Sequence, residues 1–312
     1  MGANRKPSKQ GSLRAKSLSA SRPRPPRAAL SQNLSSKATR TVIRKHHVLQ
    51  KQLSAARASS DQETIQRIET EIRETGGLTA YQNASLVGQS NPRGGDSSKL
   101  LLEWLEADLS RIGKSGKRLR LLEVGAIHPR NAITVQSAIE ATRIDLRSSH
   151  PDIEQQDFMD RPVPRSEDQK FDILSLSLVL NYSGTPASRG LMLARCAQFL
   201  REDSSQLSGQ SLKNTTVLIP ALFLVLPLPC VTNSRYLTLD HLQDIMKALG
   251  FAMTKCKQTQ KLSYTLWQYH HHGTRIESNT DEGGRLGVRS RRFSKQELNP
   301  GVGRNNFCVV LE

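Results

Sequence analysis

The first regular pattern of hydrophobic positions along the chain is helical. It extends from about residue 41 to residue 73, and its clearest apolar face holds Ile65, Ile68 and Ile72, at positions i, i+3 and i+7. The glycine pair 76–77 is expected to end this stretch. A second helix is predicted to follow, because leucines recur with the same spacing from residue 101 to residue 109 and Asp96 or Ser97 can cap its start.

Beyond residue 114 the pattern changes to alternating strands and helices. Buried strands are expected at 119–124, 142–146, 152–158, 171–180 and 221–226. Helices are expected at 131–140, 188–200 and 239–250, and further strand candidates at 251–258, 262–269 and 306–312. Such alternation is typical of an α/β layer with a mostly parallel sheet, to which the last strands add an antiparallel edge.

Charge separates a basic tail from this body. Residues 1–60 carry 14 Lys or Arg and no acid, so only +3 of the net charge of +17 remains for the rest (17 − 14). We therefore expect three parts: a disordered basic tail at 1–40, a helical region at 41–113 and an α/β domain at 114–312. Such a tail suits nuclear or nucleolar targeting or a phosphate-rich partner, and a solvated tail that only aids solubility is the alternative.

Several classes of protein are disfavoured. The longest apolar run, 217–231, is too short to span a bilayer and contains three prolines, so we expect an intracellular protein without a membrane partner. The four cysteines are widely spaced, which indicates neither a disulfide framework nor a zinc site. Adjacent histidines at 270–272 point in different directions, and no metal is expected.

The ends of the first three strands suggest a ligand. Gly125 follows the first strand and allows close approach of the backbone, although a plain turn is the alternative interpretation. Asp145, 20 residues further on at the end of the second strand, could bind ribose hydroxyls. Asp157 could accept a hydrogen bond from the exocyclic amine of an adenine, with Phe158 packing on the adenine ring. Because G-x-G-x-x-G is absent, S-adenosylmethionine suits this loop better than NAD or FAD.

Longer motifs carry a family resemblance over roughly residues 75–312. The stretches that carry it include "GGLTAYQNASLVGQS", "RGGDSSKLLLEWL", "LLEVGAI", "IEQQDFMDRPVP", "FDILSLSLVLNYS" and "RNNFCVVL". They resemble the fungal 25S ribosomal RNA adenine-N1 methyltransferases. The resemblance implies a Rossmann-like class I methyltransferase fold, S-adenosyl-L-methionine as cofactor, and ribosomal RNA within a pre-ribosome as partner, in the nucleus and nucleolus. Animal relatives resemble S-adenosylmethionine sensors, so a non-catalytic sensor that regulates a protein partner is the alternative.

By position, the resemblance assigns the cofactor-binding residues. Gly125 and Asp145 match the family's glycine and acid, and Asp157 with Phe158 matches its adenine-side motif. The segment 175–181, which contains Ser177, matches the motif beneath the methyl donor. Arg93, in "RGGDSSK", matches a signature that could cover the cofactor, while the loop "AIHPRNA" departs from the family pattern.

Methylation of adenine N1 needs no protein base, since the ring nitrogen already carries a lone pair and the sulfonium is an activated leaving group. Rate then depends on in-line placement, and the base must lie outside a helical stack because N1 is on its pairing edge. Asn181 could bond to the edge of the target base and Tyr182 could stack on it, although core or turn roles are equally open. The basic stretch "RSRRFSK" (289–295) could contact RNA phosphates or be a solvated loop.

Overall fold

The computed structural model describes residues 35–77, 80, 84, 95–148, 150–202, 218–270 and 292–312. Arg93, most of the predicted tail and the stretch 271–291 therefore lie outside the described residues. The described part contains no helix whose length and apolar character would suit a membrane span.

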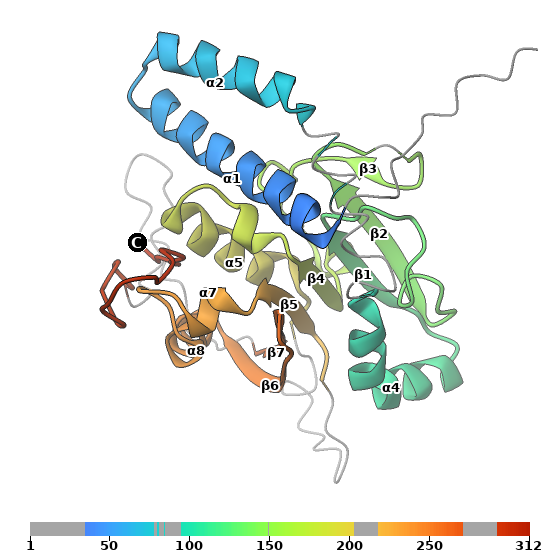
Figure 1. The fold of residues 1–312 in the computed structure, drawn as a ribbon. Helices are drawn as coiled ribbons and strands as arrows, with labels where there is room; N and C mark the ends of the chain where they lie inside the picture. The colour runs from blue at the N-terminus through green and yellow to red at the C-terminus, as the bar shows by residue number, and fades with distance from the viewer. Residues whose placement is uncertain are drawn as a thin grey trace, which may run out of the picture. The chain divides into compact units, whose positions relative to one another are not determined.

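The helical region begins with an antiparallel pair, α1 (Ser36–Ala58) and α2 (Gln62–Glu74) (Figure 1). The side-chain oxygen of Ser35 caps α1 by accepting from Ala38 N at 3.1 Å, so the helix starts earlier than the predicted residue 41. Asp61 caps α2 in the same way through Thr64 N at 3.0 Å. The pair encloses its own small core of Leu49, Leu53, Ala56 and Ile68.

A seven-stranded sheet forms the α/β domain (Figure 1). Its strands are β1 (Leu119–Val124), β2 (Ile139–Asp145), β3 (Glu154–Gln155), β4 (Ile173–Ser177), β5 (Ala221–Pro227), β6 (Phe251–Gln258) and β7 (Leu262–Tyr269). They lie in the order β3-β2-β1-β4-β5-β7-β6. The first five strands are parallel, and β7 is antiparallel to both β5 and β6. The predicted Rossmann-like class I methyltransferase fold with an antiparallel edge is confirmed.

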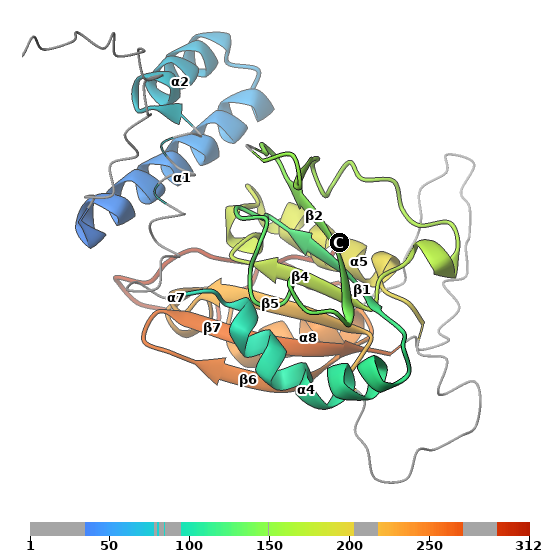
Figure 2. The same cartoon turned by 90° about the vertical axis from the view of Figure 1, so that its right-hand side faces the viewer.

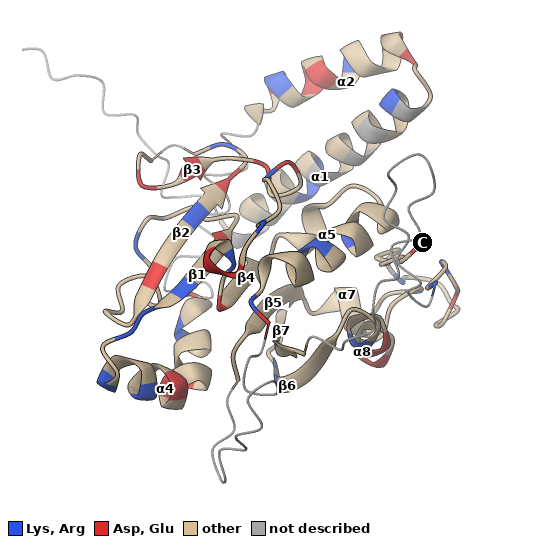
Figure 3. Cartoon of the chain, turned by 180° about the vertical axis from the view of Figure 1, so that it is seen from behind, with Lys and Arg blue, Asp and Glu red and all other residues tan. Residues whose placement is uncertain are grey.

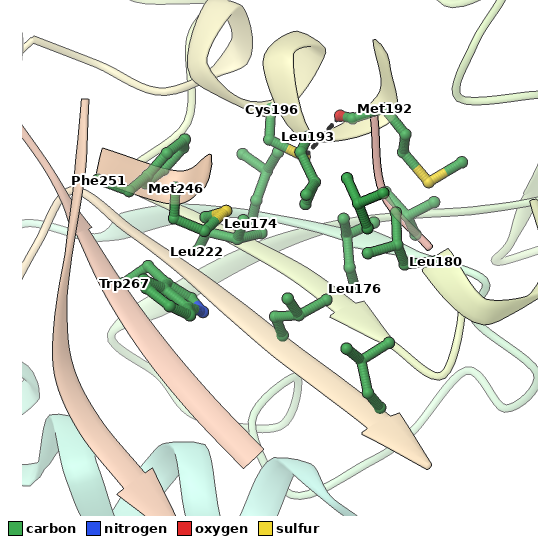
Figure 4. Close-up of a cluster of buried hydrophobic side chains, with 14 of the residues drawn as sticks. Leu174, Leu176, Leu180, Met192, Leu193, Cys196, Leu222, Met246, Phe251 and Trp267 are labelled. Carbon is green, nitrogen blue, oxygen red and sulfur yellow. Dashed lines mark hydrogen bonds between the residues drawn. The ribbon is translucent and has the colours of Figure 1, made fainter. Parts of the chain in front are cut away.

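Helices cover both faces of the sheet (Figure 2). They are α4 (Ser98–Lys114), α5 (Pro186–Phe199), α7 (Pro229–Thr232) and α8 (Leu239–Ala248), with short 3-10 turns η2 (Glu167–Gln169) and η3 (Leu180–Tyr182). One face packs on α4 through Leu101 and Leu105. On the other face α5 and α8 share a core with the inward side chains of β4 and β5, around the fully buried Trp267 (Figure 4).

The predicted helix at 131–140 is wrong. Residues 132–138 form turns, and β2 begins at Ile139. The Asn131 side chain accepts from Thr134 N at 3.1 Å, a local turn that competes with helix formation. Ile133, within the predicted helix, is instead part of a turn and is buried in the core beneath α4.

The predicted strand at 306–312 is also wrong. Residues 307–311 of this segment are buried but do not join the sheet, and the segment makes one isolated bridge, from Leu311 to Phe293. It lies across the start of α5, where Val310 N donates to Pro186 O at 3.1 Å. The third and fourth predicted strands are shorter than expected and end at Gln155 and Ser177.

Candidate functional site

Gly125 turns the chain sharply at the carboxyl end of β1. Its φ of +76° lies in the left-handed region that side chains other than glycine rarely adopt. Its N–H donates to Ile144 O at 2.8 Å, and an added Cβ would lie 2.6 Å from Val179 Cγ2. The loop after β1 is therefore packed directly on the segment that follows β4.

The segment after β4 is a second unusual turn. Leu178 has a φ of +59°, a conformation that is uncommon for a residue with a branched side chain. Its N–H donates to Val225 O at 3.0 Å, and the chain then enters η3, which carries Asn181 and Tyr182. Strained backbone of this kind clusters at functional sites. Nothing in the sequence signals it, because leucine has no preference for this conformation.

Asp145 and Asp157 lie at neighbouring strand ends on the same edge as Gly125. The order of the sheet places β1, β2 and β3 side by side, and Gln156 N, next to Asp157, donates to Asp145 O at 2.8 Å. Each aspartate stabilises its own turn by accepting a backbone hydrogen bond at Oδ1. Asp145 accepts from Arg147 N at 2.9 Å, and Asp157 accepts from Met159 N at 2.8 Å. The structure thus brings together the glycine and the two acids that the sequence singled out.

Phe158 lies beneath this edge and not on it. It is 3% exposed, and its ring centroid is 5.1 Å from that of Phe199 on α5. The guanidinium of Arg195 lies over the same ring and donates to the Phe158 carbonyl oxygen at 2.9 Å. In this structure the ring is part of the core, so its contribution at the edge is to support the Asp157 turn.

Residues 96–98, which lie in the signature "RGGDSSK" and were predicted to start a helix, tie α4 to the candidate site. Asp96 accepts from Ser98 N at 2.9 Å and from Ala132 N at 2.6 Å, so it satisfies one N–H of the first turn of α4 and also holds the loop after β1. The N-cap residue itself is Ser97, whose side chain makes no capping hydrogen bond. The hydroxyl oxygens of Ser97 and Ser177 lie 2.9 Å apart, which links the same segment to the end of β4. The predicted residue Ser177 is therefore at the edge, held by a partner 80 positions earlier in the chain.

Glu123 is the functional candidate that sequence reasoning missed. It faces Arg143 across the β1–β2 register, on two strands that carry both basic and acidic residues (Figure 3). Asn131 Nδ2 donates to its Oε1 at 2.6 Å, whereas the buried Oε2 has no hydrogen-bond partner. Burial raises the pKa of Glu123 to about 7; Arg143 opposes this shift, Asp96 adds to it and the Asn131 hydrogen bond opposes it. The signal available in the sequence was the position of Glu123, an acid two residues before Gly125.

Arg143 Nε, on the residue opposite Glu123, and Asn181 Oδ1 are also buried without a hydrogen-bond partner. Buried acceptors without a donor are uncommon and costly, by about 1–3 kcal/mol each. Glu123 Oε2 and Asn181 Oδ1 would both be satisfied by a ligand that offers N–H donors, such as an ammonium group or an exocyclic amine. No group of three or more His, Cys, Asp or Glu residues in the described ranges could hold a metal, and His271 and His272 lie outside those ranges.

Several known proteins resemble this chain in sequence or in fold. The family model described as "25S rRNA (adenine(2142)-N(1))-methyltransferase, Bmt2" matches residues 66–309. The 25S rRNA adenine-N(1) methyltransferase of Schizosaccharomyces pombe is 34% identical over 86% of this chain and 89% of its own length. The 25S rRNA (adenine(2142)-N(1))-methyltransferase of Saccharomyces cerevisiae is 34% identical over 78% of this chain, but only 63% of its own length is matched. Among solved structures, TnmH aligns at 13% identity with a TM-score of 0.41, over 72% of this chain and 69% of TnmH.

Proposed function

This chain belongs to the Bmt2 family of 25S rRNA (adenine-N1)-methyltransferases, and from that premise we propose that it transfers a methyl group from S-adenosylmethionine to N1 of an adenine in 25S rRNA. The observation that carries the proposal is the family match itself, which spans residues 66–309 and so includes every element of the candidate site. The name of the budding-yeast relative specifies adenine 2142, and the equivalent adenine is the first position to test.

The residues at the edge of the sheet fit this cofactor. S-adenosylmethionine supplies the activated methyl group and carries an ammonium, ribose hydroxyls and an adenine amine, but no phosphate. Glu123 Oε2 would accept from the ammonium, Asp145 from the ribose and Asp157 from the adenine amine. The left-handed turn at Gly125 leaves no Cβ between the ligand and the backbone. We assign no part to Arg93 beyond its place in the family signature.

Methylation of the adenine depends on how the site positions the base more than on proton transfer by the protein. Adenine N1 attacks with its own lone pair, so the protein has to exclude water and to align the ring with the methyl group. The unpartnered Oδ1 of Asn181 suits the exocyclic amine of the target adenine, and Tyr182 lies beside it on η3. These two residues are proposed to hold the base once it has left its stack.

We also propose that the substrate is met within a pre-ribosome, in the nucleolus. The 14 basic residues without an acid in residues 1–60 support this, because charge of that sign favours phosphate-rich partners.

The decisive experiment is labelled methyl transfer by the purified chain onto 25S rRNA from a deletion strain, followed by mapping of the modified base. We expect one N1-methyladenosine, seen as a stop of reverse transcription that is absent from the deletion strain and restored by the enzyme. A chain that binds S-adenosylmethionine, labels no RNA and associates with a protein in a cofactor-dependent manner would instead support the sensor alternative.

A further inference from the structure

A hollow of about 600 Å³ lies beside the first turn of α5, outside the cofactor edge. We refer to it as the α5 groove. It is lined by residues 185–187 at the start of α5, by Arg292, Ser294 and Lys295, and by residues 310–312. Three segments that are distant in the sequence therefore build it together.

The walls of the α5 groove are firmly held. Phe293 and Leu311 exchange two backbone hydrogen bonds of 2.8 and 3.1 Å, and Val310 N donates to Pro186 O at 3.1 Å. The last segment also lies so close to α5 that a Cβ on Gly190 would be 1.8 Å from the Val310 carbonyl oxygen. The groove is thus a feature of the packed domain, with basic side chains mounted on ordered backbone.

The basic side chains of the α5 groove form no salt bridge in the part of the chain that the structure describes. No salt bridge within the described ranges involves Arg292, Lys295 or the neighbouring Arg189. Lys295 Nζ lies 4.4 Å from the centre of the Tyr236 ring, which orients the ammonium without neutralising it. Arg189 is mostly buried, donates to Cys308 O at 2.8 Å and has an Nε without a partner. Glu312 is the one acid among the lining residues.

The α5 groove lies near the carboxyl edge of the sheet, where the candidate site also lies. The chain leaves the carboxyl end of β4, passes through η3 with Asn181 and Tyr182, and reaches the lining residue Thr185 three positions later. A polymer whose base entered the site near η3 would therefore have its backbone within reach of this groove.

We propose that the α5 groove binds backbone phosphates of the single-stranded RNA segment that carries the target adenine. This inference rests on the proposed function, because a base presented outside a helix needs its flanking backbone held. The groove offers cations and no exposed aromatic ring among its lining residues, so it would hold the strand by charge and would not read its sequence. Of the basic stretch 289–295, it is Arg292 and Lys295 that line this groove.

The test measures binding of the full chain to a fluorescein-labelled single-stranded RNA that copies the sequence around the target adenine. Loss of one phosphate contact reduces the slope of log K against log salt by about 0.7, which corresponds to about fivefold weaker binding at about 0.1 M salt. We expect this loss from Arg292→Ala and from Lys295→Ala. Arg292→Lys keeps the charge and should bind like the wild type, and Glu312→Gln should bind more tightly.

The matched control is Lys117→Ala, which removes one exposed charge from the loop before β1, at the opposite edge of the sheet. Alanine variants at 292 and 295 that bind RNA as Lys117→Ala does, or that bind weakly with an unchanged salt slope, would overturn the inference. Calorimetry with S-adenosylmethionine should give wild-type affinity for all variants. If RNA binding depends on the groove but no methyl group is transferred, the proposed function fails and the inference about the groove stands. If the alanine variants at 292 and 295 methylate and bind RNA like the wild type, the proposed function stands and the inference about the groove fails.

Discussion

Replacing Glu123 with glutamine removes a buried acid whose pKa is raised from 4.5 to about 7. Between these two values the folded protein keeps a proton that the unfolded chain has already released. The free energy of unfolding of the wild type therefore falls as the pH rises through this window. At about 1.4 kcal/mol per pKa unit, this one group accounts for about 3 kcal/mol. Arg143, Asp96 and Asn131 surround the acid.

The assay is denaturant unfolding of the cofactor-free protein at about pH 5 and about pH 8, where the acid is mostly protonated and mostly ionised in the folded state. Glu123→Gln should gain about 2.5 kcal/mol relative to the wild type between the two conditions, because only the wild type pays for burying the charge and the unfolded acid is already largely ionised at about pH 5. Glu140→Gln, an exposed change on β2, serves as the control and should follow the wild type. Parallel curves for Glu123→Gln and the wild type would refute the reasoning. The cofactor gives a second readout, since its ammonium should bind more tightly to the wild type as the pH rises through about 7 and show no such gain with the variant.

Three further substitutions test the geometry of the candidate site. Gly125→Ala should destabilise the fold by about 1–2 kcal/mol for the left-handed backbone alone, and the extra cost of the 2.6 Å contact should disappear in a Val179→Ala background, as measured by a double-mutant cycle. Asp96→Ala should lower the free energy of unfolding by about 2–3 kcal/mol in thermal or urea unfolding, because two N–H groups lose a charged acceptor; an unchanged stability would mean that water replaces it. Asp145→Ala should weaken S-adenosylmethionine binding by about 1–3 kcal/mol in calorimetry, with circular dichroism to confirm the fold, and wild-type affinity would place the ribose elsewhere.

The elements that the sequence predicted well are those with a strong repeating pattern. β1, β5, β6 and β7 lie where expected, because each is a continuous or alternating apolar run bounded by turns. The prediction of a helix at 131–140 was wrong because Ile133 and Ile139 belong to different elements. Ile133 is buried in a turn, and Ile139 begins β2. The strand predicted at 306–312 failed because burial alone does not distinguish a strand from an extended segment packed on a helix.

The sequence by itself determined which of the predicted site residues meet at the carboxyl edge of the sheet. Once strands 119–124, 142–146 and 152–158 are taken as parallel neighbours, their carboxyl ends must share one edge, and Gly125, Asp145 and Asp157 follow without any knowledge of packing. Only the tertiary structure decided how that edge is completed. The Ser97–Ser177 contact and the hydrogen bond from Ala132 N to Asp96 join residues up to 80 positions apart, and burial leaves one oxygen of Glu123 without a partner. Local periodicity reports burial within one element, whereas pairing between elements depends on how their surfaces pack.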